Sequence, residues 1–340
     1  MQGELSGGKV VVAGSEAGIL AKGYGRKKDR LELSLEEAAF LFETGKISTI
    51  KEGEERELNL EEFLKHALDV SPEFGLRYLV YRDLKERGYV VQPGGVDFWL
   101  YPRGAKPGEK PARYFIRILS ERGFLSLKEL DSLLILARNM RKEPIIAVVD
   151  EESDVTYYEV KEAQFEFVEK WEGKAEEIRK AKATLLGDRV VLWDTDLAKN
   201  LHINNFYGKL TKEKRLLLSL VEAAYLMKKN MLEIDTGQFI EYASSIESDF
   251  MDKYVVYEYL REKGLIIKTG FKFGSHFRVY KAANQKHSSY LIHVLPEEHV
   301  FSMPELARAV RLAHGVKKRM IFARTFNQRI RYVDVGRMKL

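Results

Sequence analysis

Apolar and polar positions along the chain form a pattern that occurs twice. Residues 78–88 (YLVYRDLKERG) match residues 254–264 (YVVYEYLREKG), with aromatic and aliphatic side chains at helical spacing and a terminal glycine typical of a helix C-cap. Upstream, residues 33–41 match residues 218–226, and Ser34 is the expected N-cap of a helix there. Because the shared positions keep the same order, we predict two copies of one unit, here called copy one and copy two.

Each copy is predicted to have two parts. The first part contains a short strand, a Tyr-Gly pair and an amphipathic helix. The second part contains a Tyr-rich helix, two strands, another helix and a closing strand pair, so the fold class is α+β. The expected strands and helices after the Tyr-rich helix are 98–101, 114–119, 126–141, 145–149 and 155–160 in copy one, and 277–280, 290–295 and 303–318 in copy two.

The domain limits follow from the repeat. We expect N-terminal subdomains at residues 1–70 and 184–250, each a small α/β unit. The mixed-sheet C-terminal subdomains are expected at residues 71–160 and 251–340. Residues 161–183 are rich in Lys and Glu and are predicted to form a charged, helical linker between the copies.

The composition narrows the class of protein. Hydrophobic residues make up 45% of the 340 positions and aromatic residues 11%, which indicates globular cores. The sequence has no cysteine, which excludes disulfides, thiol nucleophiles and thiolate metal sites. It has no apolar run long enough for a membrane span and no visible signal peptide. We therefore expect a cytoplasmic protein with no membrane partner.

The positive charge is concentrated in copy two. The net charge is only +5, but residues 306–340 contain ten Lys or Arg against the single acid Asp334, and residues 265–296 contain no Asp or Glu. A field of this kind attracts a polyanion. An ordinary solvated surface would explain the same charges without a partner.

Three side chains in this basic region have the right types for cutting RNA without a metal. That reaction needs a base for the 2′-hydroxyl, an acid for the departing 5′-oxygen and a fixed cation. His287 can serve as the acid and Lys318 as the cation. Tyr280 would be the base, provided that nearby cations lower its pKa from about 10. As alternatives, Tyr280 could be a packed strand residue and His287 an ordinary surface histidine.

Comparison of the copies favours a catalytic role. Tyr280 aligns with Tyr101 and Lys318 with Lys142, whereas His287 aligns with Pro111. Copy one therefore lacks the proposed acid, and around Tyr101 it loses cations and gains prolines. The interpretation is one active copy fused to one disabled copy. His276 also lies on the strand of Tyr280, but it alternates away from the other candidates and is only a secondary one.

Three segments of copy two, residues 273–280 (FGSHFRVY), 286–292 (KHSSYLI) and 310–318 (VRLAHGVKK), resemble the active-site segments of the archaeal tRNA-splicing endonucleases. The resemblance covers nearly the whole chain and is closest to the two-repeat homodimeric type. It implies a nuclease-like C-terminal subdomain with a Tyr, His and Lys triad at Tyr280, His287 and Lys318, with Lys317 as the neighbouring alternative. It also implies cleavage of precursor tRNA at bulge-helix-bulge intron boundaries, leaving a 2′,3′-cyclic phosphate and a 5′-hydroxyl, with no metal and no cofactor.

The resemblance further implies arginines that clamp an unstacked base. Arg311 matches one of them, and either Arg329 or Arg331 is the candidate for the other. An acidic loop in copy one, with Asp150, Glu151, Glu152 and Asp154, is expected to bind the second copy of a partner chain and so to form a homodimer. A plain exposed acidic turn is the alternative.

Two other functions compete with the endonuclease. A non-catalytic RNA-binding or scaffold protein would use the basic tail to hold phosphates and would not need His287. A metal-dependent nuclease would need clustered carboxylates, which the acid-free stretch does not provide.

Overall fold

The computed structural model describes residues 1–13, 16–53, 56–165, 180–234, 238–282, 285–326 and 329–340. It divides into two compact units. Unit 1 comprises residues 1–161, 300–306 and 336–340, and unit 2 comprises residues 162–299 and 307–335. Unit 1 therefore contains copy one, and unit 2 contains most of copy two.

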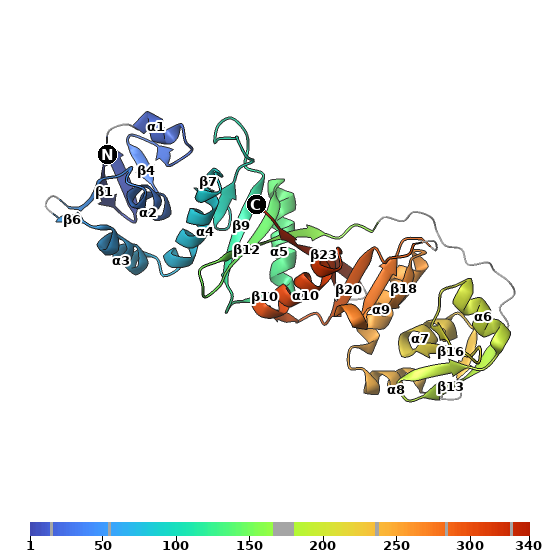
Figure 1. Cartoon of the computed structure of the whole chain (residues 1–340). Helices are drawn as coiled ribbons and strands as arrows, with labels where there is room; N and C mark the ends of the chain where they lie inside the picture. The colour runs from blue at the N-terminus through green and yellow to red at the C-terminus, as the bar shows by residue number, and fades with distance from the viewer. Residues whose placement is uncertain (14–15, 54–55, 166–179, 235–237, 283–284, 327–328) are drawn as a thin grey trace. The chain divides into compact units, whose positions relative to one another are not determined.

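The N-terminal subdomain of unit 1, blue in Figure 1, is built on a six-stranded sheet. The strand order is β3-β4-β2-β1-β5-β6. In this sheet β1 is antiparallel to β2 and parallel to β5. Val10, Val12 and Leu33 of the sheet are fully buried, so the core of the subdomain lies on this face. The elements are β1 (Gln2–Ser6), β2 (Lys9–Ala13), α1 (Glu16–Leu20), β3 (Arg26–Lys27), β4 (Leu31–Leu33), α2 (Leu35–Glu43), β5 (Thr49–Glu52), β6 (Arg56–Leu58) and α3 (Leu60–Val70).

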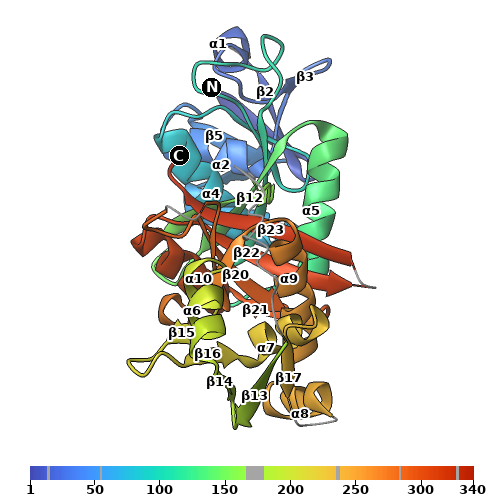
Figure 2. The ribbon, with the colours of Figure 1, turned by 90° about the vertical axis from the view of Figure 1, so that its right-hand side faces the viewer.

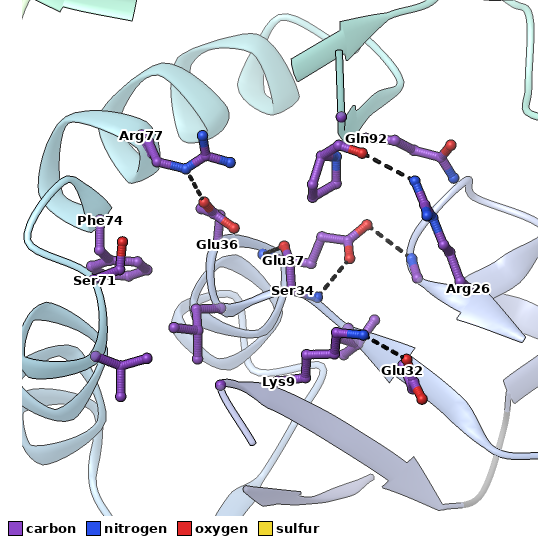
Figure 3. Close-up of a pocket in the computed structure, with 17 residues that line it drawn as sticks. Lys9, Arg26, Glu32, Ser34, Glu36, Glu37, Ser71, Phe74, Arg77 and Gln92 are labelled. Atoms are coloured by element: carbon purple, nitrogen blue, oxygen red, sulfur yellow. Dashed lines mark hydrogen bonds and ion pairs between the residues drawn. The ribbon is translucent and has the colours of Figure 1, made fainter. Parts of the chain in front are cut away.

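A buried glutamate explains why the Tyr-Gly pair recurs. Glu37 accepts hydrogen bonds from the backbone N–H groups of Gly25 (2.8 Å) and of the N-cap residue Ser34 (2.9 Å), as Figure 3 shows. Gly25 has φ +69°, and a Cβ atom there would lie 2.8 Å from the main-chain oxygen of Glu32, so only glycine fits. Copy two repeats the arrangement with Glu222 and Gly208 (2.8 Å). The expected N-cap at Ser34 is confirmed.

The C-terminal subdomain of unit 1 orders its strands β12-β11-β9-β8-β7. Helix α4 packs on β9 and β11 and buries Tyr78 and Tyr81, so the Tyr-rich helix is a packing element as predicted. A short strand, β21, pairs with β10. The elements are α4 (Phe74–Glu86), β7 (Val91–Pro93), β8 (Phe98–Leu100), β9 (Tyr114–Ser120), β10 (Phe124–Ser126), α5 (Leu127–Met140), β11 (Glu143–Val149), β12 (Val155–Glu162) and β21 (Val300–Ser302).

Unit 2 repeats this plan. Its first sheet has the order β15-β16-β14-β13-β17, and its second part orders β18-β19-β20-β22-β23 with α9 against the sheet; Figure 2 shows the long β22–β23 hairpin. The first sheet and its helices are β13 (Ala181–Leu186), β14 (Arg189–Leu192), α6 (Thr195–Ile203), β15 (Lys209–Leu210), β16 (Leu216–Ser219), α7 (Leu220–Lys228), β17 (Leu232–Ile234) and α8 (Phe239–Ile246). The second part has α9 (Phe250–Glu262), β18 (Ile266–Thr269), η1 (Phe271–Phe273), β19 (Phe277–Tyr280), β20 (Tyr290–Leu295), α10 (Met303–Gly315), β22 (Met320–Phe326) and β23 (Arg329–Met338).

The predicted α+β fold in two tandem copies is confirmed, with two local differences. The expected linker helix is wrong at its ends, because residues 161–162 belong to β12 and residues 181–183 to β13; residues 166–179 lie outside the described residues. Helix α10 ends at Gly315 and not at residue 318, because Lys317 adopts a left-handed conformation with φ +56°. Among the helices that the structure describes, none is long and apolar enough to cross a membrane.

Candidate active site

Tyr280, His287 and Lys318 all lie at one edge of the unit 2 sheet. Tyr280 is the last residue of β19, His287 is in the loop that leads from β19 to β20, and Lys318 immediately precedes β22. Because β19 is antiparallel to β20 and β20 is parallel to β22, the end of β19 and the beginnings of β20 and β22 meet at this edge. The register pairs Val279 with Tyr290 and Leu291 with Met320.

A hydrogen bond fixes the lysine next to the histidine loop. The Nζ atom of Lys318 donates to the main-chain oxygen of Ser288, the residue that follows His287. Partial burial and the nearby Arg278 guanidinium lower the pKa of Lys318 from its usual value. Lys317, the alternative, is exposed and has no such contact among the described residues. The geometry therefore turns Lys318, and not Lys317, toward the candidate site.

The loop that carries His287 is held at both ends. The side-chain oxygen of Gln285 accepts hydrogen bonds from the Lys281 backbone N–H (2.9 Å) and the Ser289 hydroxyl (3.1 Å). Ser289 in turn donates its N–H to the main-chain oxygen of Val279 (2.7 Å). The His287 side chain is exposed, so an approaching phosphate could reach it. Residues 283–284 lie outside the described residues.

The corresponding edge of unit 1 keeps the lysine and loses the histidine. Lys142 donates from Nζ to the main-chain oxygen of Ala112 (2.7 Å), in the same manner as Lys318. Tyr101 is buried and donates its hydroxyl hydrogen to the Gln92 side chain (3.1 Å), and burial raises its pKa. The neighbouring Pro111 has no ionisable group. This edge can hold a cation but cannot supply an acid.

The candidate base-clamping residues do not all lie at this edge. Arg311 is exposed on α10, seven residues before Lys318 in the sequence, and the helix ends between them at Gly315. Arg329 and Arg331 are exposed at the start of β23, and Arg329 pairs with Phe326 at the end of β22. The length of β22 places them roughly 20 Å from the end where Lys318 lies. Arg329 and Arg331 therefore lie at the far end of the β22–β23 hairpin from Lys318.

The acidic loop forms a tight turn between β11 and β12. The carboxylate of Asp150 accepts hydrogen bonds from the N–H groups of Glu152 (3.0 Å) and Asp154 (2.9 Å). Glu151 forms an ion pair with Arg122. Glu152 and Asp154 are exposed, and neither has a cation partner among the described residues. The turn therefore presents two negative side chains in a fixed backbone.

His276, the secondary candidate, has a structural position. Its Nδ1 atom accepts a hydrogen bond from the N–H of Val294 (2.9 Å), and its ring stacks on His293 at 4.4 Å. Burial, with a smaller contribution from His293, lowers the pKa of His276 to about 4. In copy one the carboxylate of Asp97 makes the equivalent bond to the N–H of Ile118 (2.8 Å). Two different side chains thus hold the same backbone position.

A cavity of about 540 Å³ lies in unit 1 beside α2 and α4 (Figure 3). Most of its charged lining is paired: Arg77 bonds Glu36 at 2.6 Å, and Lys9 bonds Glu32 at 2.9 Å. Arg26 donates to the main-chain oxygen of Pro93 (3.2 Å) and has no carboxylate partner among the described residues. Across the described residues, no group of three His, Asp or Glu side chains is arranged to hold a metal ion.

The sequence matches one family of known proteins over most of its length. The sequence model of the tRNA intron endonuclease catalytic C-terminal domain matches residues 74–157 and 250–332, and that of the N-terminal domain matches residues 1–64 and 181–243. A tRNA-splicing endonuclease from Methanococcoides burtonii is 46% identical over 93% of each chain. Those from Methanosarcina mazei and Methanosarcina acetivorans are 44% identical over 98% and 100% of each chain. The chain therefore belongs to the tRNA intron endonuclease family, with both of its domains present twice.

Proposed function

We propose that this enzyme cuts precursor tRNA at intron boundaries folded as a bulge-helix-bulge, without a metal. The Lys318 hydrogen bond to Ser288, beside His287, is the observation that carries the proposal. It holds an ammonium group at the loop that carries the exposed His287, at the edge where Tyr280 ends its strand. These are the three groups that the chemistry needs.

The proposed reaction is a transesterification. Tyr280, in its phenolate form, accepts the proton of the 2′-hydroxyl, and the 2′-oxygen attacks the adjacent phosphorus. A new bond forms from O2′ to phosphorus while the bond from phosphorus to O5′ breaks, and His287 protonates the departing O5′. Lys318 stabilises the extra negative charge on the pentacoordinate phosphate. The products are a 2′,3′-cyclic phosphate and a 5′-hydroxyl.

The roles of the basic side chains follow from their positions. Arg311 is proposed to hold an unstacked bulge base near the scissile phosphate, because a guanidinium plane stacks well on a base. Arg329 and Arg331 are proposed to contact RNA elsewhere, since β22 separates them from Lys318. Lys317 is proposed as a phosphate contact. The proposed place of action is the cytoplasm.

A homodimer is proposed from the acidic turn. Glu152 and Asp154 are exposed, uncompensated and fixed by Asp150, so they suit a basic surface of a second chain. The double variant Glu152→Lys with Asp154→Lys is expected to lower the mass measured by light scattering in low salt. The matched control is Glu4→Lys with Asp69→Lys, also two exposed acids of unit 1. A dimer that survives the first double variant in both low and high salt would rule out this role.

The central test is incubation with a bulge-helix-bulge RNA in EDTA, followed by analysis of the product ends. We expect cyclic phosphate and 5′-hydroxyl ends. His287→Ala should lower the single-turnover rate by about 10²-fold to 10⁴-fold with binding retained, whereas the exposed His314→Ala should cleave normally. Products ending in a 3′-hydroxyl would exclude the mechanism.

A purely RNA-binding role would give a different result. Binding without cleavage by the wild-type chain, together with no effect of His287→Ala, would favour the scaffold function.

A further inference from the structure

We propose that copy one retains an RNA-binding site in the loop of residues 102–113, which we call the basic loop. This inference rests on the proposed function, because its ligand is the precursor tRNA. The basic loop has Arg103, Lys106, Lys110 and Arg113 and the single acid Glu109, and all five side chains are exposed. It would bind the phosphate backbone without cleaving it.

The cations of the basic loop are available to a ligand. In the part of the chain that the structure describes, Arg103, Lys106 and Lys110 have no carboxylate partner, and only Arg113 forms an ion pair, with Glu143 (3.0 Å). The Arg103 guanidinium rests on the Tyr89 ring at 4.9 Å, which orients it without neutralising its charge. Three uncompensated positive charges in twelve residues match a polyanion.

The basic loop is also ordered internally, which lowers the entropy cost of binding. Ala105 and Ala112 are buried against Tyr101 in a small apolar cluster of their own. Backbone hydrogen bonds join Ala105 to Pro102 (3.0 Å) and Lys110 to Lys106 (3.2 Å). The turns and prolines that the copy comparison associates with loss of activity therefore build a fixed platform.

Its position in the fold indicates which polyanion binds. The basic loop connects β8 to β9, as the His287 loop connects β19 to β20. Lys142 reaches back to it through the Ala112 oxygen, and its amine lies 5.3 Å from the Trp99 ring. Copy one thus keeps the support of the candidate RNA-cutting edge and replaces the acid by Pro111. The expected loss of cations around Tyr101 is wrong, because the basic loop that follows Tyr101 carries four of them. We infer that this edge faces RNA in both copies.

The test compares two triple variants of the full chain on an intron-containing precursor tRNA transcript. The first is Arg103→Gln, Lys106→Gln and Lys110→Gln. The control is Lys209→Gln, Lys212→Gln and Lys214→Gln, which removes three exposed charges from unit 2. Dissociation constants are measured at several salt concentrations, and cleavage is measured at saturating enzyme. Thermal unfolding checks that both variants fold.

We expect the basic-loop variant to bind the transcript about 10-fold more weakly near 0.1 M salt. The slope of its log dissociation constant against log salt concentration should decrease by the equivalent of about two phosphate contacts. Its cleavage rate at saturating enzyme should stay within about threefold of the wild type, because no group of the candidate active site has changed. The control should bind within about threefold of the wild type.

Three results would overturn the proposal: unchanged RNA affinity, as expected if the loop bound an acidic protein; an equal loss in the control; or a slower rate at saturation with unchanged affinity. Failure of the proposed function would look different, because the wild-type enzyme itself would then not cleave the transcript.

Discussion

The amine of Lys318 is hydrogen-bonded to the main-chain oxygen of Ser288, and this contact joins the segment before β22 to the loop that carries His287. An equivalent contact joins Lys142 to Ala112 in copy one. The fold therefore provides the lysine position twice, and the histidine accompanies it once. Substituting each lysine in turn therefore distinguishes a structural role of this contact from a catalytic one.

Lys318→Ala is expected to lower the single-turnover rate by about 10²-fold to 10³-fold, because it removes the cation that faces the developing charge. Lys142→Ala removes the same contact in copy one and should leave that rate within about threefold of the wild type. Both are measured at saturating enzyme. Equal losses in the two variants would mean that the lysine supports the fold only.

Tyr280→Phe is expected to lower the cleavage rate by about 10²-fold or more, because the phenyl ring fills the same space but cannot accept a proton. Tyr101→Phe, which removes the hydroxyl bonded to Gln92, is the matched control and should cut at the wild-type rate. Rapid-quench cleavage assays distinguish them. Full activity of Tyr280→Phe would remove Tyr280 from the mechanism.

Arg77→Ala is expected to destabilise unit 1 by about 3 kcal/mol, because it leaves the buried carboxylate of Glu36 without a cation and that of Asp97 with only Arg117. Arg77 bonds Glu36 at 2.6 Å and Asp97 at 2.9 Å, and Figure 3 shows the first of these contacts. Lys253→Ala, the counterpart in copy two, should cost about 1 kcal/mol or less, since its partners Glu247 and Asp249 are partly exposed. Urea unfolding monitored by circular dichroism measures both free energies of unfolding. Similar losses in the two variants would contradict the conclusion that burial of the carboxylates sets the cost.

Acid should weaken unit 2 through His276. Its pKa is about 4 in the folded chain and about 6.5 when unfolded, so between these values the unfolded state binds more protons. The contribution to stability is fully present above about pH 6.5 and is lost as the pH falls toward 4, by about 3 kcal/mol at most.

His276→Gln keeps an acceptor for the Val294 N–H and should flatten this part of the stability profile. His314→Gln alters an exposed histidine and should leave the profile unchanged. Urea unfolding at several pH values between 4 and 7 measures this effect. A profile in His276→Gln as steep as that of the wild type would exclude His276 as its source.

Local signals in the sequence predicted much of this structure. The N-cap at Ser34 and the strand limits 277–280 and 290–295 agree with the structure, because capping and alternation depend on neighbouring residues. Strand β13 was missed, since its alternation is short and its charged flank suggested a helix. Its pairing with β14 and β17 depends on distant segments.

Some features of the candidate site are likewise visible in the sequence, and others depend on the fold. The types of Tyr280, His287 and Lys318 are visible in the sequence, and their roles remain predictions. The support of Lys318 was not visible, because the acceptor is a main-chain oxygen, which any residue at position 288 would supply. The distance from Lys318 to Arg329 follows from the β22–β23 hairpin and has no counterpart in residue spacing.

The different acceptors at the start of β8 and β19 limit how the two halves of the gene can evolve. Asp97 sits among the guanidinium groups of Arg77 and Arg117, whereas His276 lies 3.6 Å from the carboxylate of Asp249. A recombination event that copied Asp97 into the second half would place a second carboxylate beside Asp249, and one that copied His276 into the first half would remove the ion pair of Arg117. Each half therefore depends on its own electrostatic surroundings, which disfavours gene conversion between the two repeats.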